Sequence, residues 1–460
     1  MISSYTIYKL LPVVLQNVAS SLEGLRVKKE RYGGNFYKLL LDAEKRTTWS
    51  NEEIVSYRNN RLKQYLKHCQ ENIPFYREYF RDNDLDYRDI HSLEDLTSLP
   101  IITKREINEN LALFTNNKLS RRNVVKMYTS GSTGSPLHFY TTKEALRELW
   151  SIFWRYRRWH GINLDSWGAY LLGRPIVPIE NENPPYWRIN LPGRQLLMSG
   201  FHLNKANSIW YLKELKKRKI SWIYGYPSLI ALLAHYKIEE DFELGYKMEC
   251  ITTNSENLLP EQINKIKKAF GIKPVQLYGM AEAVANISEC PSGFLHVDED
   301  YSAVEFIKID NNVGYKIVGT NYSNYATAFV RYEINDIFQL DDAKCDCGRP
   351  GRIVKSIDGR KEDYIFLKNG RRVGRMSLTF KNTSNIMEAQ ILQKNINDIV
   401  VRIVKGVNYS KRDENILLSA LNDRTGGLLK IKFEYVDKIP RTPNGKLRLV
   451  VSELYDNIVN

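Results

Sequence analysis

The stretch Tyr128-Thr129-Ser130-Gly131-Ser132-Thr133-Gly134-Ser135-Pro136 is the most informative part of this chain. Glycine lets the main chain approach a ligand closely, and hydroxyl and backbone N–H groups donate to phosphate oxygens. It is not a Walker loop, because that pattern ends in Lys-Ser/Thr, whereas Ser135-Pro136 stands here. The stretch by itself leaves two interpretations open, a phosphate-binding loop and a plain surface turn. If it binds phosphate, a catalytic cation must come from elsewhere in the chain.

Length and composition restrict the class of protein. The chain has 460 residues, 43% hydrophobic and 26% charged, which is typical of a soluble globular protein with two or more domains. Lys and Arg number 67 against 53 Asp and Glu, and the formal charge of +14 suits nucleotides, nucleic acid or an anionic membrane surface. The five cysteines are an odd number, which favours a reducing, cytoplasmic location over a disulfide framework.

Hydrophobic periodicity predicts a mixed α/β fold. Helical patterns at 208–219 and 260–270 alternate with short apolar runs at 222–224 and 275–278, as in an α/β sheet. The runs at 304–307, 315–318 and 329–332 predict three antiparallel strands, a small barrel-like part of the same large domain. A helix is predicted from Asn51 up to Pro74, and Thr103 with Glu106 forms a capping box. After Gly359 we expect a separate α+β unit of about a hundred residues.

The N-terminus predicts an amphipathic helix. Its apolar residues share one helical face, and they are Ile7, Leu11, Val14, Leu15, Val18 and Leu22. A signal peptide is disfavoured, because Lys9, Pro12 and Gln16 interrupt the apolar run. We expect this face to pack on the protein's own core, with docking on a membrane surface as the alternative.

Further motifs follow the Ser/Gly-rich stretch in a set order. They are Tyr278-Gly279-Met280-Ala281-Glu282, Arg331-Tyr332-Glu333-Ile334-Asn335-Asp336, Gly359-Arg360-Lys361-Glu362-Asp363 and Pro440-Arg441-Thr442-Pro443-Asn444-Gly445-Lys446. In this order the motifs resemble the core motifs of the adenylate-forming superfamily of acyl-CoA synthetases and peptide-synthetase adenylation domains. The chain is most similar to the phenylacetate-CoA ligase-like family, in its capsular-polysaccharide branch. The resemblance covers about residues 50 to 460.

The resemblance implies ATP-dependent activation of a carboxylic acid as an acyl adenylate, with pyrophosphate release. Ser130, Ser132 and Thr133 would hold the β- and γ-phosphates, Tyr278 would stack on adenine, and Glu282 would bind Mg²⁺. Asp336 would accept from both ribose hydroxyls, and Arg360 would donate to ribose or phosphate. Lys446 would bridge the attacking carboxylate and the α-phosphate, so Lys446 and Glu282 are the expected catalytic residues. The remaining expected nucleotide-binding residues are Gly131, Gly134, Ser255, Glu256, Gly279 and Met280.

The resemblance also implies two domains, an adenylate-forming domain at 1–358 and a mobile lid at 359–460 hinged near Glu362. The expected partners are a small aryl, acyl or amino acid and a thiol acceptor such as coenzyme A. A carrier protein or an amino sugar of a surface polysaccharide is the alternative acceptor. A non-catalytic protein that binds nucleic acid or a membrane is a further alternative, disfavoured because Lys446 is retained. The sequence departs from the family pattern at Ala281 and Asn335. These departures affect the details expected of the nucleotide site and leave the expected class of protein unchanged.

Two other segments carry chemistry. Cys345 and Cys347 form a Cys-x-Cys pair that, with Cys290 and His296, offers the four ligands of a closed structural Zn²⁺ site; unligated thiols are the alternative. The segment 149–160 interleaves aromatic residues with arginines, a pattern also found in proteins that bind single-stranded nucleic acid. Its helical spacing favours a buried aromatic face with solvated arginines instead, so we do not expect nucleic acid as a partner.

Overall fold

A computed structural model of the chain describes residues 4–129, 137–174, 176–309, 314–360, 365–368, 372–373, 376–380, 383, 385–406, 408–442 and 446–454. The chain forms two compact units, each built from separated segments. The first unit comprises Met1–Gly24, Asp165–Gln276 and Asp358–Asn460. The second unit comprises Leu25–Leu164 and Leu277–Ile357. The mixed α/β architecture predicted from the sequence is confirmed.

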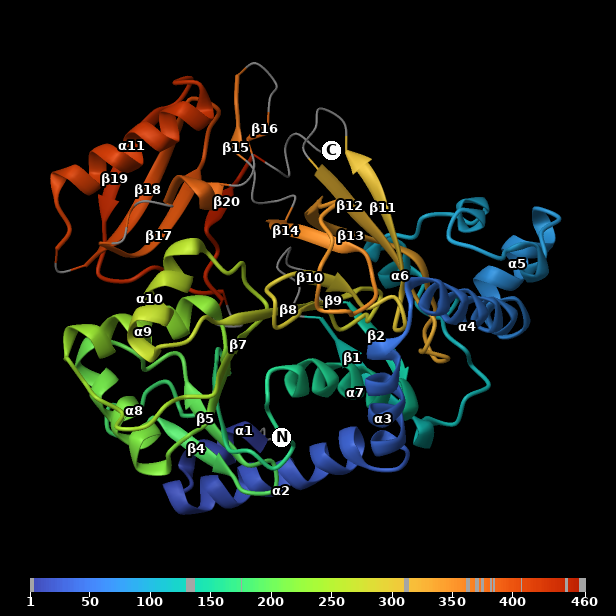
Figure 1. Ribbon diagram of the computed structural model, residues 1–460, viewed down its shortest axis with the longest axis horizontal. Helices are drawn as coiled ribbons and strands as arrows, with labels where there is room; N and C mark the ends of the chain where they lie inside the picture. The colour runs from blue at the N-terminus through green and yellow to red at the C-terminus, as the bar shows by residue number, and fades with distance from the viewer. Residues whose placement is uncertain are drawn as a thin grey trace. The chain divides into compact units, whose positions relative to one another are not determined.

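The first unit contains a largely parallel sheet with the order β7-β6-β3-β5-β4 (Figure 1). Its strands are β3 (Gly168–Leu172), β4 (Trp187–Asn190), β5 (Gln195–Ser199), β6 (Trp222–Gly225) and β7 (Cys250–Thr253). The edge strand β4 is antiparallel to β5, and β8 (Val275–Gly279) begins beside β7. The helices of this part are α8 (Lys205–Arg218), α9 (Pro227–Glu239) and α10 (Pro260–Phe270), so both predicted helices and both predicted strands are present.

The C-terminal part of the first unit is a second, four-stranded sheet with the order β19-β18-β17-β20. Its strands are β17 (Ile386–Gln393), β18 (Asp398–Lys405), β19 (Lys430–Tyr435) and β20 (Val450–Ser452), and α11 (Lys411–Thr425) covers one face (Figure 1). A hairpin of β15 (Ile365–Phe366) and β16 (Arg372–Val373) precedes it. Residues 358–460 therefore group with 165–276 by contact. A separate lid that moves in catalysis stays a prediction.

The second unit contains an antiparallel sheet with the order β11-β12-β13-β14-β10-β9-β8. Its strands are β9 (Asn286–Glu289), β10 (Leu295–Val297), β11 (Ala303–Ile309), β12 (Gly314–Asn321), β13 (Phe329–Leu340) and β14 (Ile353–Arg360), together with the end of β8. The three antiparallel strands predicted from the sequence are β11, β12 and β13, and their pairing is confirmed. A short hairpin of β1 (Val124–Tyr128) and β2 (His138–Thr142) leads into and out of the Ser/Gly-rich stretch.

The helices of the second unit are α3 (Phe36–Lys45), α4 (Asn51–Asn72), α5 (Pro74–Asp82), α6 (Lys104–Glu109) and α7 (Lys143–Trp159). Ser50 and Glu53 form a capping box that starts α4, and the predicted box of Thr103 and Glu106 starts α6. Pro74 ends the first predicted helix and starts the next, because proline lacks a backbone N–H and is tolerated at the first helical position.

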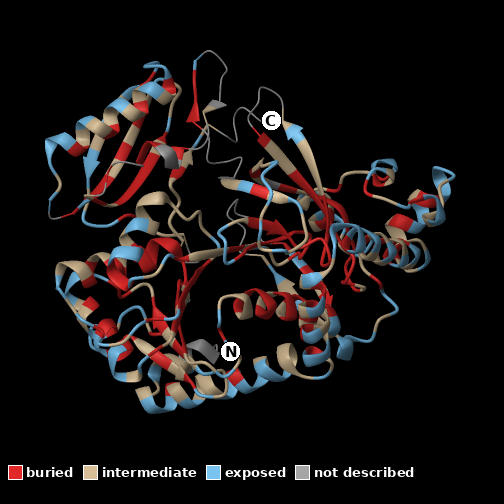
Figure 2. Cartoon of the chain, viewed as in Figure 1, coloured by how far each residue is buried: buried red, intermediate tan, exposed pale blue. Residues whose placement is uncertain are grey.

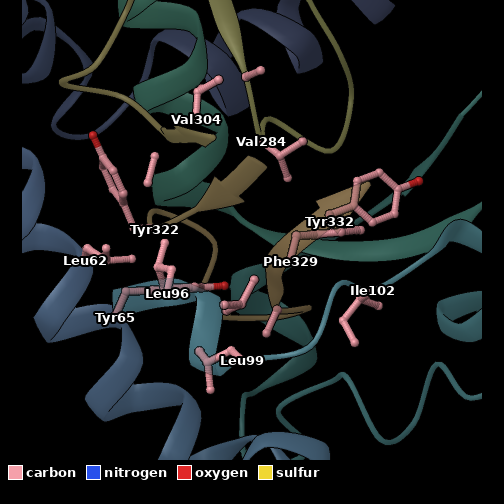
Figure 3. Close-up of a cluster of buried hydrophobic side chains, with 14 of the residues drawn as sticks. Leu62, Tyr65, Leu96, Leu99, Ile102, Val284, Val304, Tyr322, Phe329 and Tyr332 are labelled. Carbon is pink, nitrogen blue, oxygen red and sulfur yellow. The ribbon is translucent and has the colours of Figure 1, made fainter. Parts of the chain in front are cut away.

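A hydrophobic cluster joins these helices to the antiparallel sheet (Figure 3). Leu62 and Tyr65 of α4 pack in the same cluster as Val304, Phe329 and Tyr332, which come from β11 and β13. The Tyr65 hydroxyl donates to the backbone oxygen of Asn324 at 3.0 Å, which satisfies its one buried polar atom. The cluster therefore fixes β13, which carries Asp336, against the N-terminal helices of its own unit.

The aromatic helix α7 corrects one sequence expectation. On the face that the helical spacing predicts, Leu146, Leu149 and Tyr156 are buried, and Phe153 and His160 are half-buried. Arg155 and Arg157 are also buried, whereas solvated arginines were expected. Figure 2 shows much of α7 in the colour of buried residues. Two carboxylates accept from Arg155, and the Arg157 guanidinium lies 4.8 Å from the Trp154 ring centroid, so each cation has a compensating partner.

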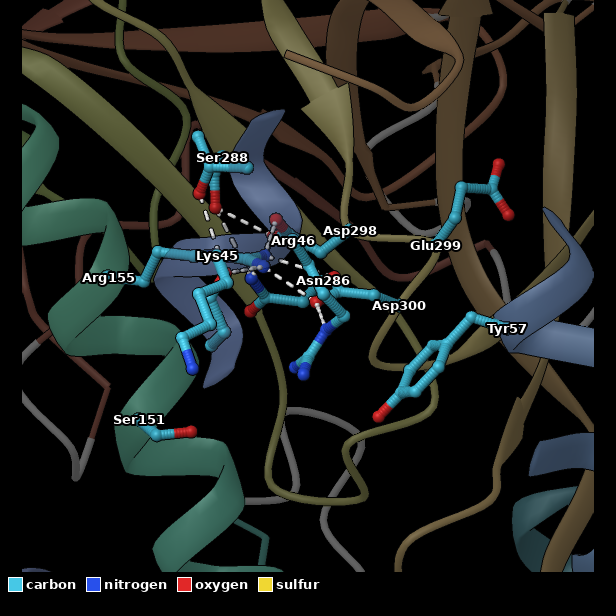
Figure 4. Close-up of polar contacts among 12 residues, drawn as sticks. Lys45, Arg46, Tyr57, Ser151, Arg155, Asn286, Ser288, Asp298, Glu299 and Asp300 are labelled. Atoms are coloured by element: carbon cyan, nitrogen blue, oxygen red, sulfur yellow. Dashed lines mark hydrogen bonds and ion pairs between the residues drawn. The ribbon is translucent and has the colours of Figure 1, made fainter. Parts of the chain in front are cut away.

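Arg155 is the centre of a buried ion-pair network (Figure 4). Its guanidinium donates to Asp298 at 2.5 Å and to Asp300 at 2.7 Å. Arg46, between α3 and α4, donates to Asp300 at 2.6 Å, and Ser288 of β9 donates to Asp298 at 2.7 Å. The network joins α7, the α3–α4 connection and the β9–β10 strand pair, and each carboxylate has several donors as burial requires.

We predict that Arg155→Met destabilises the protein by about 3–5 kcal/mol, because it leaves two buried carboxylates without their shared cation. Arg158→Met on the same helix is the matched control. Its pair with Glu44 is partly exposed, so its loss should cost less than about 1 kcal/mol. Urea unfolding followed by tryptophan fluorescence measures both, and equal losses would contradict the prediction.

The same network predicts acid sensitivity. Burial acts to raise the pKa of Asp300, but Arg155 and Arg46 outweigh it and hold that pKa at about 2, below the ordinary 3.8. This carboxylate therefore adds stability above pH 4 that is lost as the pH falls through its folded pKa. Asp300→Asn should remove this part of the acid dependence between about pH 4 and 2.

Candidate functional site

Tyr278 and Asp336 meet in the second unit although 58 residues separate them in the chain. Tyr278 lies near the end of β8 and Asp336 lies in β13, and the phenol donates to the Asp336 carboxylate at 2.6 Å. The Tyr278 ring packs edge-on against Phe338, with ring centroids 5.2 Å apart. Two residues predicted to bind the adenosine of ATP are thus brought together, one with an aromatic face and one with an acceptor pair.

Glu282 lies in the turn that follows β8 and is buried. The Tyr332 hydroxyl donates to its carboxylate at 3.3 Å, and Asn321 donates to its backbone oxygen at 2.9 Å. The turn is held from β12 and β13, so the Glu282 backbone has a fixed position. A buried carboxylate needs a compensating donor or cation, and Mg²⁺ is a suitable one.

Two residues with left-handed backbone adjoin the predicted site. Ser255, immediately before Glu256, has φ of 67°, and Ala283, immediately after Glu282, has φ of 57°. Such backbone is uncommon for residues with a Cβ and is concentrated at functional sites. The sequence offers no sign of it, because neither position is Gly, Asn or Asp.

In the first unit, two hydrogen bonds join Lys446 to Thr442. The Lys446 N–H donates to Thr442 Oγ1 at 3.0 Å, and the Thr442 N–H donates to the Lys446 backbone oxygen at 3.0 Å. The Lys446 ammonium lies 6.0 Å from the centroid of the Tyr226 ring. Burial, aided by the nearby Glu256 charge, raises the pKa of Tyr226 to about 12, so this phenol is neutral at physiological pH.

A set of contacts, here named the C-terminal clamp, ties the Lys446 segment to the start of α9. It consists of Ser228, Glu256, Glu388, Arg441 and Leu447. Glu256 accepts from the Ser228 N–H at 3.1 Å and from the Leu447 N–H at 2.8 Å. Arg441 donates to Ser228 Oγ at 3.1 Å and pairs with the buried Glu388 of β17.

The clamp has a simple physical origin. The first N–H groups of α9 lack helical partners, and a carboxylate at a helix N-terminus satisfies one and is favoured by the helix dipole. One carboxylate oxygen of Glu256 accepts from the Ser228 N–H of α9, and the other accepts from the N–H of Leu447, the residue after Lys446. Sequence reasoning missed Ser228, Glu388 and Leu447, and it quoted Arg441 without a role. The clamp defines the position of the Lys446 backbone relative to α9 and the segment that follows β7.

The remaining predicted site residues are in part outside the described residues and in part placed by the structure. Ser130, Gly131, Ser132, Thr133, Gly134 and Glu362 lie outside the described residues. Arg360 is the last residue of β14, and its side chain is outside the description. Gly279 ends β8, and Met280 packs against the hydrophobic cluster of the second unit. Both oxygens of Glu256 accept from the protein, so any role in ATP binding stays a prediction, as it does for Ser255.

Cys290, His296, Cys345 and Cys347 converge in the second unit, with ligand atoms within 4.8 Å of one another. Cys290 Sγ is 3.7 Å from Cys345 Sγ, and Cys347 Sγ is 3.4 Å from His296 Nε2. His296 Nδ1 lies 3.2 Å from the Pro350 backbone oxygen, which favours a proton on Nδ1 and leaves the Nε2 lone pair toward the thiols. Three thiols and one imidazole at these separations fit a tetrahedral Zn²⁺.

Comparison with known proteins agrees with the fold. Residues 365–453 match the family model described as the CapK C-terminal domain. The chain is 28% identical over 455 residues to protein CapK of Staphylococcus aureus, covering 97% of this chain and 99% of that protein. It is 22% identical to a phenylacetate-coenzyme A ligase of Thermus thermophilus, over 70% of this chain and 73% of the enzyme.

A solved structure of 2-hydroxyisobutyryl-CoA ligase in the postadenylation state superposes with a TM-score of 0.70 at 18% identity. The match covers 89% of this chain and 91% of that enzyme. At this identity the likeness establishes the fold. The chain therefore has the fold of the adenylate-forming ligases. The resemblance to the phenylacetate-CoA ligase-like family and its capsular-polysaccharide branch that the motifs predict is confirmed, and the similarity to protein CapK extends over nearly the whole chain.

We predict that Glu256→Gln loosens the C-terminal clamp. The amide keeps one acceptor but turns an NH₂ toward a backbone N–H, so one charge-assisted hydrogen bond is lost. Amide hydrogen exchange of the peptide containing Leu447 should accelerate by about tenfold. Glu249→Gln, an exposed carboxylate of the same unit, is the control. Unchanged exchange at Leu447 in Glu256→Gln would show that the clamp does not hold this segment.

Proposed function

We propose that this protein activates a small carboxylic acid with ATP and transfers the acyl group to a thiol such as coenzyme A. A carboxylate oxygen attacks the α-phosphorus of ATP, and pyrophosphate leaves with the electrons of the broken P–O bond. The thiol sulfur then attacks the acyl carbon of the mixed anhydride, its proton goes to solvent or a base, and AMP leaves. The observation that carries the proposal is the 2.6 Å contact of Tyr278 with Asp336.

The adenosine end of ATP is assigned to the second unit. An aromatic face packs well on a purine ring, and a carboxylate accepts from two adjacent ribose hydroxyls. Tyr278 and Asp336 supply these groups from neighbouring positions, with β8 and β13 holding their backbones. The Ser130–Gly134 stretch, between β1 and β2 of the same unit, is proposed to hold the phosphates.

Lys446 and Glu282 are proposed to act on the charge that develops during adenylation. Two anions, the carboxylate and the α-phosphate, must approach each other, and a lysine ammonium between them lowers that repulsion. Glu282 would hold Mg²⁺, which neutralises phosphate charge. The backbone freedom of Lys446 is limited by its hydrogen bonds with Thr442 and by the bond from the Leu447 N–H to Glu256. A preorganised catalytic cation requires such restraint.

The acceptor is proposed to be coenzyme A. Similar solved structures hold 2-hydroxyisobutyryl-CoA ligase with an acyl-AMP and with coenzyme A, which supports a thiol acceptor by analogy. Assays with coenzyme A, a holo carrier protein and amino sugars in parallel distinguish this acceptor from the alternatives.

Lys446→Ala should reduce acid-dependent exchange of labelled pyrophosphate into ATP by about a hundredfold or more, because a charge at the transition state is lost. Lys438→Ala, an exposed lysine of the same unit, should leave the exchange unchanged. The assay uses a panel of aryl, acyl and amino acids. Absence of exchange with every acid, or full exchange by Lys446→Ala, would refute the proposal.

The cysteine cluster is proposed to bind one structural Zn²⁺. Burial raises the pKa of Cys345 to about 12 and lowers that of His296, so binding at the thiol must displace a proton. A closed four-ligand site leaves no position for substrate, so the ion would tie the β9–β10 turn to the segment before β14.

The zinc proposal predicts one equivalent of Zn²⁺ in protein purified without chelator, measured by mass spectrometry of the metal. Cys345→Ser with Cys347→Ser should abolish the metal and lower the melting temperature. Cys250→Ala removes a buried thiol of the other unit and should keep full zinc occupancy. Metal-free wild-type protein with an unchanged melting temperature would contradict the site.

A further inference from the structure

The N-terminal helices turn their apolar face outward instead of toward the core. They are α1 (Ser4–Leu10) and α2 (Val13–Tyr32), and the sequence predicts that their apolar face packs on the core. The prediction is wrong, because that face is exposed except for the half-buried Leu11, and Leu10 beside it is exposed as well (Figure 2). The exposed fractions are 83% for Leu10, 71% for Val14, 50% for Val18 and 62% for Leu22. Ile7 and Leu15 are also exposed, so an aliphatic stripe runs along both helices.

The polar face of α2 packs on the protein because it satisfies an edge strand. Asn17 accepts from the Ile189 N–H of β4 at 2.9 Å. Ser21 donates to the Ile189 backbone oxygen at 3.2 Å and accepts from the Leu191 N–H at 3.2 Å. Gln16 accepts from the buried Arg188 at 2.5 Å. β4 ends its sheet, so its outer backbone groups need these partners, and the inward face of the helix must therefore be polar.

The outward aliphatic residues have no corresponding role in folding. Contiguous exposed apolar side chains on a soluble protein mark an interaction surface. The exposed stripe consists of Ile7, Leu10, Val14, Leu15, Val18 and Leu22. It lacks the tyrosine, tryptophan and arginine side chains that dominate binding at protein interfaces. Among the described residues, no helix is long and apolar enough to cross a bilayer.

The positive charge of the chain favours an anionic partner for the exposed stripe. The chain carries a formal +14, and α2 continues beyond the stripe with the exposed cations Lys28 and Lys29. A second copy brings the same positive surplus and is repelled, whereas anionic lipid headgroups attract it. A helix of 20 residues is about 30 Å long, and an amphipathic helix of this kind can lie in a headgroup region with its apolar side chains inserted.

From these observations we infer that the exposed stripe of α1 and α2 docks the protein on an anionic membrane surface. The aliphatic side chains enter the boundary between headgroups and acyl chains, and Lys28 and Lys29 contact the headgroups. The adenylation site is not used in this contact, so the inference stands independently of the proposed function.

Flotation of the full-length protein with lipid vesicles tests the inference. One set of vesicles contains 30% phosphatidylglycerol in phosphatidylcholine, and the other contains phosphatidylcholine alone. We expect binding to the anionic set, weakened at least tenfold by Val18→Asp with Leu22→Asp. Lys28→Glu with Lys29→Glu should weaken binding to the anionic set alone, by about fivefold per lysine at low salt.

Leu191→Asp is the matched control, since Leu191 is an exposed aliphatic residue outside the stripe, and it should bind as the wild type does. Thermal unfolding checks that the variants remain folded, as exposed substitutions should. Failure of the wild type to float with anionic vesicles would overturn the inference. A concentration-dependent dimer in sedimentation, abolished by Val18→Asp with Leu22→Asp, would overturn it in favour of self-association.

Discussion

The second unit depends on the compensation of buried charge at Arg155. One guanidinium joins Asp298 and Asp300, and these acids also receive hydrogen bonds from Arg46 and Ser288. Removal of any one partner leaves a charge in a medium that solvates it poorly. Through these bonds α7 and the α3–α4 connection hold β9, the strand that follows the turn bearing Glu282. The site turn is thus fixed by electrostatics on one side and by the hydrophobic cluster on the other.

The first unit applies a similar principle at its own site. Glu256 serves two N–H donors that lie 219 residues apart in the chain, at Ser228 and Leu447. A carboxylate with two lone-pair-bearing oxygens is suited to this bridging role, and a helix N-terminus supplies one of the donors. The bridge couples the C-terminal sheet to the parallel sheet within one compact unit. It also means that Lys446 owes its position to contacts that lie outside its own motif.

Several features were predictable from the sequence because their cause is local. The helix starts at Ser50 and Thr103, the helix at 260–270 and the strands β11 to β13 follow from caps, proline and periodicity. The convergence of Tyr278 with Asp336, and of Cys290 and His296 with Cys345 and Cys347, was implied by motif order and by ligand chemistry. The same motifs carry the family resemblance, and the relatives agree with it.

Periodicity identified the amphipathic character of α2 but could not say which face points inward. That choice depends on β4, whose outer backbone groups lie at the end of a sheet and take Asn17 and Ser21 as partners. Likewise, the burial of Arg155 and the double use of Glu256 each require at least one partner more than 140 residues away. The sequence by itself determined the family resemblance, the local elements and the residues with reactive side chains. Only the tertiary structure decided which polar groups are paired and which apolar groups stay exposed, because both depend on contacts between distant segments.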